Sequence, residues 1–191
     1  NVSELFQNKY RTKTLRLKDW NYGWDAFYFI TICTHKGIWF FGKIKNQKMI
    51  LNNFGKIIQK NLLNIPKHFN FTELDEHIVM PNHVHVIVRI LPHKGRDAIN
   101  RVSTNNNDRG GVTGQYNPMG KQTIGEIIRW YKGGCTFQIN QQHPNNIFKW
   151  QPRFYDHIIR SQESLENIRH YIKINPEKWE QDRNNITGLY Y

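Results

Sequence analysis

Two apolar patterns alternate along the chain, one with the period of a β-strand and one with the period of an α-helix. The segments rich in β-branched and aromatic residues, typical of strands, are Ala26–Thr34, Phe71–Met80, His83–Leu91 and Phe154–Ile159. The segments with helical apolar spacing are Asn52–Ile65, Thr123–Gln141 and Gln162–Ile174. Their order predicts an α+β fold, a ferredoxin-like βαββαβ antiparallel sheet with an additional C-terminal helix.

Each predicted helix begins next to a side chain that can accept hydrogen bonds from backbone amides. These N-cap candidates are Asn52 or Asn53, Thr123 and Ser161. Pro66 is expected to end the first helix, since proline disrupts a helix interior. Gly133-Gly134 in the second helix indicates a kink or a close approach of another backbone.

The length of the chain fits a single domain spanning residues 1–191. Ile38–Lys43 and Lys48–Leu51 predict a lesser hairpin around Asn46. Residues 92–120 are rich in Gly, Asn, Ser and Thr without periodicity, which predicts a flexible insert loop. No apolar run reaches membrane-spanning length, no signal peptide is recognisable, and no glycine-rich nucleotide-binding loop is present.

A histidine pair follows the Pro81-Asn82 turn. Beyond it, Val84, Val86, Val88 and Ile90 share one strand face, and His83, His85, Ile87 and Arg89 share the other. Two imidazoles at positions i and i+2 of a rigid strand are aimed at one point, a good geometry for a divalent metal ion. The alternative is a chance pair on an exposed strand face, and the chain has nine histidines.

Charge adds a candidate partner. The formal net charge is +12 and the isoelectric point is near 9.8, an excess that favours a polyanion such as nucleic acid over mere solubility. Residues 1–24 form a basic N-terminal arm that could follow a phosphate backbone or remain a solvated terminus. The candidate DNA-binding residues of this arm are Lys9, Arg11, Lys13, Arg16 and Lys18.

Tyr171 and Asn175 lie one turn apart on the last predicted helix and project from one face. Spacing alone favours an ordinary core or edge tyrosine and a helix-terminal asparagine ahead of Pro176. Cys33 and Cys135 lie far apart in unrelated contexts, which suits a reducing cytoplasm better than a disulfide framework.

Three ordered blocks resemble the REP-associated tyrosine transposases, a branch of the single-tyrosine HUH (His–hydrophobic–His) transposases. The blocks are HIVMPNHVHVIV at residues 77–88, WQPRFYDHIIR at 150–160 and LENIRHYIKINPEKW at 165–179. Near the start, RTKTLRLKDWNYG, AFYFITICT and FGKI extend the resemblance over nearly the whole chain. The 92–120 insert lies outside it.

The resemblance implies a metal-dependent endonuclease and strand transferase that acts on single-stranded DNA beside palindromic hairpin repeats. His83 and His85 would bind a divalent ion, Mg or Mn, and Asn175 would be a third, amide-bearing ligand. Tyr171 would be the nucleophile and would form a 5′-phosphotyrosine. The family block also contains Asp156 and His157, either of which could orient a ligand or simply complete a strand end.

Two other functions stay open on the sequence. A non-catalytic module that binds DNA or RNA hairpins explains the charge equally well, but requires neither a metal nor the phenol. A metal-dependent hydrolase would use water as nucleophile and usually needs more acidic ligands than the sequence places near His83 and His85. No membrane or nucleotide cofactor is expected as a partner, and the protein could be a monomer or a homodimer.

Overall fold

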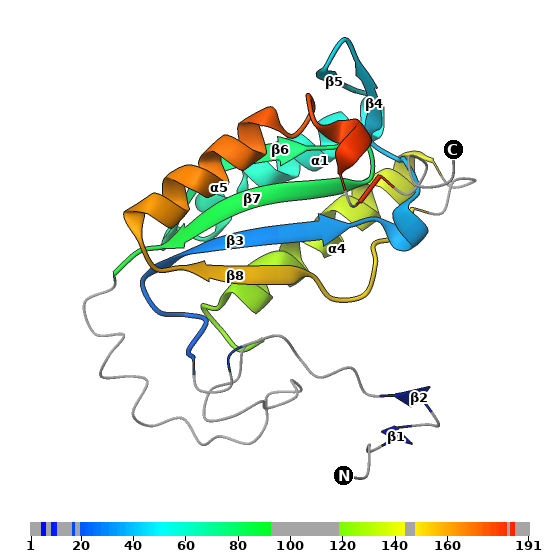
Figure 1. Ribbon diagram of the computed structural model, residues 1–191. Coiled ribbons are helices and arrows are strands. Elements are labelled where there is room, and N and C mark those ends of the chain that lie inside the picture. The colour runs from blue at the N-terminus through cyan, green and yellow to red at the C-terminus, as the bar shows by residue number, and fades with distance from the viewer. Residues whose placement is uncertain are drawn as a thin grey trace.

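A four-stranded antiparallel sheet forms the centre of the molecule (Figure 1). The computed structural model describes residues 17, 20–92, 119–143, 148–182 and 184–185, together with the backbone of β1 (Leu5–Phe6) and β2 (Lys9–Tyr10). The sheet strands are β3 (Ala26–Cys33), β6 (Thr72–Val79), β7 (His83–Ile90) and β8 (Tyr155–Ile159). Their spatial order is β6-β7-β3-β8, which confirms the predicted ferredoxin-like arrangement.

The longer helices lie on both faces of this sheet, with α1 and α4 on one face and α5 on the other (Figure 1). The helices are α1 (Asn53–Leu63), α2 (Ile65–His68), α4 (Ile124–Gln142) and α5 (Gln162–Ile174), with 3-10 turns η1 (His35–Gly37) and η2 (Trp179–Gln181). The predicted N-caps are confirmed, because Asn52, Thr123 and Ser161 each accept a hydrogen bond from a first-turn amide. None of the described helices is both long and apolar enough to span a membrane.

Two predictions about helix interiors are wrong. The first helix ends at Leu63, before Pro66, which lies in the first turn of α2 where a missing amide hydrogen is tolerated. Helix α4 runs through Gly133 and Gly134 without a break. A Cβ at Gly133 would meet no atom within 4 Å, and one at Gly134 would make only an ordinary 3.7 Å contact with the Asn61 side chain.

A separate two-stranded ribbon, β4 (Gly42–Lys45) and β5 (Lys48–Leu51), projects from one end of the sheet (Figure 1). The prediction of a strand over Ile38–Lys43 is wrong in its bounds. Asn46 and Gln47 both have positive φ, 51° and 59°, as a two-residue turn matched to strand twist requires. This turn fixes the pairing register, so the ribbon is centred on it and β4 begins only at Gly42.

The two faces of the sheet differ in composition. Val84, Val86, Val88 and Ile90 of β7 belong to the main apolar core with α1 and α4, which confirms the predicted alternation. The opposite face holds a smaller buried cluster that packs under α5, namely Ile87, Ile159, Leu165 and Ile172. The paired histidines share this second face with Ile87.

Candidate metal centre beside Tyr171

Both histidines of the pair are buried on the central strand β7, with 0% of His83 and 1% of His85 exposed. Strand β3 pairs Cys33 opposite His83 and Thr31 opposite His85. A buried imidazole costs free energy unless its nitrogens are satisfied. The exposed-face alternative for this pair is therefore wrong, and the partners of its ring nitrogens define what the site can do.

His83 is fixed in one tautomer by its sequence neighbour Asn82. The amide nitrogen of Asn82 donates to two carbonyl oxygens, of Gly37 at 3.0 Å and of Asn184 at 2.7 Å, which determines the orientation of the amide. Its Oδ1 therefore faces His83 Nδ1 at 2.9 Å and can only accept. The proton of His83 is thus on Nδ1, and Nε2 carries a lone pair suited to a metal ion.

His85 has a comparable arrangement. Its Nδ1 lies 2.8 Å from the hydroxyl of Thr31, which is 2% exposed. Its Nε2 lies 3.3 Å from the hydroxyl of Tyr171 on α5. A phenol, an imidazole nitrogen and a second buried histidine thus meet at one point between the sheet and α5.

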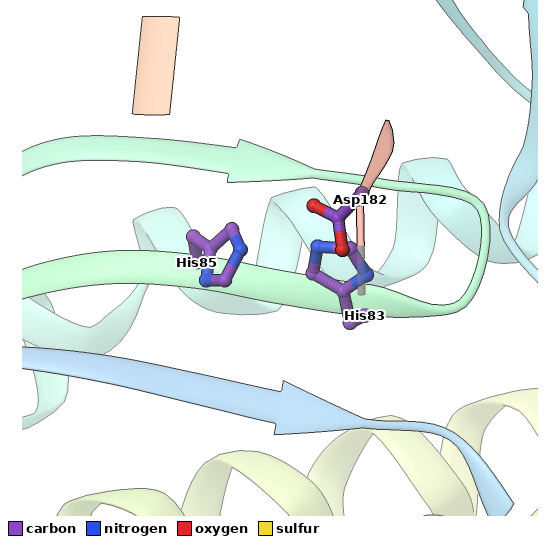
Figure 2. Close-up of side chains that lie close together, drawn as sticks. All are labelled: His83, His85 and Asp182. Atoms are coloured by element: carbon purple, nitrogen blue, oxygen red, sulfur yellow. The ribbon is translucent and has the colours of Figure 1, made fainter. Parts of the chain in front are cut away.

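Asp182, directly after η2, supplies a carboxylate at the same point. One ligand atom each from His83, His85 and Asp182 lie within 4.8 Å of one another. Figure 2 shows the Asp182 carboxylate beside the His83 ring, with His85 farther along β7. Ligands about 2.1 Å from a shared ion lie roughly 3–4 Å apart, so small side-chain movements would close the set around a cation.

Asn175, the predicted amide ligand, borders this cluster. Its amide nitrogen donates to Asp182 Oδ2 at 3.1 Å, and the residue is 2% exposed. Its Oδ1 is buried and has no hydrogen-bond partner among the described residues, which is costly unless a cation satisfies it. Two imidazoles, a carboxylate and an amide oxygen fit a divalent ion such as Mn²⁺.

Helix α5, which carries Tyr171, is attached to the edge strand β6 by two ion pairs. A bulge places Asp75 and Glu76 together opposite the single residue Ile87, so that these neighbours both reach α5. Asp75 accepts two hydrogen bonds from the guanidinium of Arg169, and Glu76 pairs with Lys173 at 3.2 Å. The hydrogen bonds from Arg169 lower the pKa of the Asp75 carboxyl.

Two residues of the resemblance, Asp156 and His157, lie outside this cluster, and other predicted site residues lie outside the described part of the chain. Asp156 and His157 lie on β8, and neither belongs to the group of candidate ligands among the described residues. Residues 93–118 of the insert lie outside the described part. So do the side chains of the basic arm, namely Lys9, Arg11, Lys13, Arg16 and Lys18.

Sequence reasoning missed Asp182 and Asn82. Nothing in the pattern around Asp182 distinguishes it from any acidic residue after a helix. Asn82 had a signal in its place between Pro81 and His83, but turns contain asparagine for many reasons.

Comparison with solved structures identifies the fold. The chain resembles the structure of a REP-associated tyrosine transposase bound to a REP hairpin, with a TM-score of 0.52 and 18% identity, covering 90% of this chain and 74% of that one. A candidate transposase from Deinococcus radiodurans is a weaker match, with a TM-score of 0.45 and 14% identity over 85% of this chain and 95% of that one. At this identity the first likeness establishes a shared fold.

Comparison of sequences identifies the family. No family model matches the chain. A protein from Haemophilus influenzae, described only as uncharacterized, is 37% identical over 174 residues, covering 90% of this chain and 91% of the Haemophilus protein. The chain belongs to the family of this Haemophilus protein.

Proposed function

We propose that this protein is a metal-dependent transposase that cuts and rejoins single-stranded DNA next to palindromic hairpin repeats, with Tyr171 as the nucleophile. The observation that carries the proposal is the 3.3 Å contact between the Tyr171 hydroxyl and His85 Nε2. It lies at a cluster in which His83, His85 and Asp182 could hold a divalent ion. A fold shared with a transposase that binds a REP hairpin supports the same class of substrate.

The reaction needs no redox partner and no external energy source. The Tyr171 hydroxyl oxygen would bond to phosphorus while the bond from phosphorus to the 3′ oxygen breaks, with its electron pair leaving on that oxygen. The phenol proton would pass to solvent and the 3′ oxygen would take one up, giving a 5′-phosphotyrosine and a 3′-hydroxyl. Rejoining is the reverse reaction, since the phosphotyrosine conserves the energy of the broken bond.

The protein groups divide this task. His83, His85, Asp182 and Asn175 would hold the ion, which when bound would stabilise negative charge on the scissile phosphate. Tyr171 is 38% exposed, so its hydroxyl can meet a phosphate that arrives from solvent. Helix α5 fixes the direction of approach, because attack requires the oxygen in line with the leaving group.

The first test uses a labelled single-stranded DNA hairpin, from repeats flanking the gene, with Mn²⁺ or Mg²⁺. We expect a denaturant-resistant protein–DNA adduct that is lost in Tyr171→Phe and with a chelator. Tight binding without an adduct would instead assign a binding module. Cleavage without an adduct would assign a hydrolase. A hydrolase usually needs acidic metal ligands, and Asp182 supplies one beside the two histidines.

Ligand substitutions test the metal assignment separately. His83→Ala and His85→Ala should abolish adduct formation. Asp182→Asn and Asn175→Ala should lower Mn²⁺ affinity by at least about tenfold. His170→Ala, an exposed histidine on α5 outside the cluster, is the matched control. Unchanged Mn²⁺ affinity in Asn175→Ala would remove that residue from the ligand set.

A further inference from the structure

The β4–β5 ribbon, residues 42–51, carries three exposed lysines on one face. Lys43 and Lys45 alternate along β4, and Lys48 on β5 lies directly opposite Lys45. Ile50, also exposed, completes this face opposite Lys43. The ribbon contains no acidic residue.

This arrangement is unfavourable in the protein alone. Like charges directly opposite one another on paired strands are destabilising by several tenths of a kcal/mol or more. None of Lys43, Lys45 and Lys48 takes part in an ion pair with a carboxylate among the described residues. A one-sided set of uncompensated cations is typical of a surface that meets a polyanion.

The segment that leads into the ribbon is attached to the turn that leads into β7, the strand of the paired histidines. The amide of Phe41, which precedes β4, donates to the carbonyl of Pro81 at 3.0 Å, two residues before His83. Trp39, 41% exposed, packs edge-on against Trp179 with ring centroids 5.5 Å apart. The Trp179 ring in turn lies 5.9 Å from that of His83. The exposed Trp39 indole, three residues before β4 in the chain, is therefore linked to the buried His83 imidazole through the Trp179 ring.

We propose that Trp39 and the lysines of the β4–β5 ribbon bind the single-stranded DNA that flanks the scissile phosphate. Trp39 stacks on a base near the metal centre, and Lys43, Lys45 and Lys48 contact phosphates of the strand that continues along the ribbon. Stacking on an aromatic ring beside a basic track is the usual means of holding a single strand without reading its sequence. This inference rests on the proposed function and adds a location for the flanking strand.

The test compares two triple variants, both in a Tyr171→Phe background so that binding is measured without covalent capture. One carries Lys43→Gln, Lys45→Gln and Lys48→Gln in the ribbon. The control removes three exposed lysines of α1 and α2, outside the ribbon, which are Lys56, Lys60 and Lys67. The two variants therefore have the same net charge.

The readout is the fluorescence anisotropy of labelled oligothymidylate over a range of salt concentrations. The ribbon variant should bind at least about tenfold more weakly at low salt, and its salt slope should fall by about 2, because each lost single-strand phosphate contact removes about 0.7. The control should stay near the parent protein. Equal loss in both triple variants, or no loss in the ribbon variant, overturns the proposal.

Trp39 is tested by tryptophan fluorescence and by affinity. Trp39→Phe should remove most of the DNA-induced quenching, and Trp39→Ala should weaken binding by about tenfold. Quenching that persists in Trp39→Phe would rule out stacking at this ring.

The proposal about the ribbon can fail while the proposed function stands. This is the outcome if the ribbon variant binds DNA normally and the native protein still forms the tyrosine adduct. Preferential binding of duplex DNA through the ribbon would overturn the single-strand assignment.

Discussion

Asn82 offers a direct test of how the protein prepares His83 for a metal ion. Asn82→Ala removes the acceptor that holds the proton of His83 on Nδ1, and it also removes the two hydrogen bonds to the carbonyls of Gly37 and Asn184. Loss of such an orienting partner lowers metal affinity by about 10- to 100-fold. This corresponds to about 1.4–2.7 kcal/mol of binding free energy. We expect isothermal titration with Mn²⁺ to show a loss in this range.

A second substitution separates orientation from stability. Asn82→Asp also loses both donated hydrogen bonds, so both variants should unfold at lower urea concentration. The aspartate keeps an oxygen facing His83 Nδ1, so Asn82→Asp should retain Mn²⁺ affinity where Asn82→Ala does not. Asn61→Ala, which removes a buried amide on α1, should lose stability and keep Mn²⁺ affinity. Equal loss of Mn²⁺ affinity in the two Asn82 variants would refute the argument about the tautomer.

Three further predictions use other parts of the molecule. Gly133→Ala should raise the free energy of unfolding by about 1 kcal/mol, because α4 has room for the methyl group. Gly55→Ala should lower the free energy of unfolding, because its Cβ would overlap a backbone carbonyl oxygen. Urea denaturation should therefore show changes of opposite sign in the free energy of unfolding of the two variants. The lowered pKa of Asp75 means that its ion pair stabilises the fold fully above the ordinary carboxyl pKa of 3.8 and that this stability is lost as the pH falls through the lower pKa of the folded state. Asp75→Asn should therefore unfold at lower urea concentration than the native protein near neutral pH, and the difference should shrink as the pH falls below 3.8. Tyr171→Phe removes the hydroxyl group that contacts His85 Nε2, so Mn²⁺ affinity should stay equal or rise a few-fold. A loss of Mn²⁺ affinity in isothermal titration would mean that the phenol itself is a ligand.

The parts of the fold that depend on local sequence were predictable. The alternation along β7 placed both histidines on the face opposite the main core, because strand side chains alternate whatever the tertiary context. The N-caps at Asn52 and Ser161 were also correct, since each depends only on a side chain and an amide three residues away.

The parts that depend on contacts distant in sequence were not predictable from these patterns. Asp182 reaches His83 only because the chain after α5 turns back over the end of β7, and no local spacing encodes that return. The bulge at Asp75 and Glu76 is defined only by the pairing of β6 with β7. The sequence of β6 alone predicts that the side chains of these two neighbours point to opposite faces of the sheet. The prediction of a kink or a close backbone approach at Gly133-Gly134 was wrong for a related reason, because only the packed structure reveals that Gly133 faces open space.

The candidate site joins two elements that are held with unequal firmness. Strand β7 is buried on both faces and paired on both edges, so His83 and His85 can hold a fixed separation. Helix α5 is attached through a smaller apolar cluster and the two ion pairs from the β6 bulge. Metal binding would use His83 and His85 from the first element and Asn175 and Asp182 from the end of the second and the chain after it, whereas attack by Tyr171 depends on the alignment of the second element with the first. Loosening α5 at Arg169 should therefore slow adduct formation more than it lowers Mn²⁺ affinity, and an equal loss of both would contradict this division.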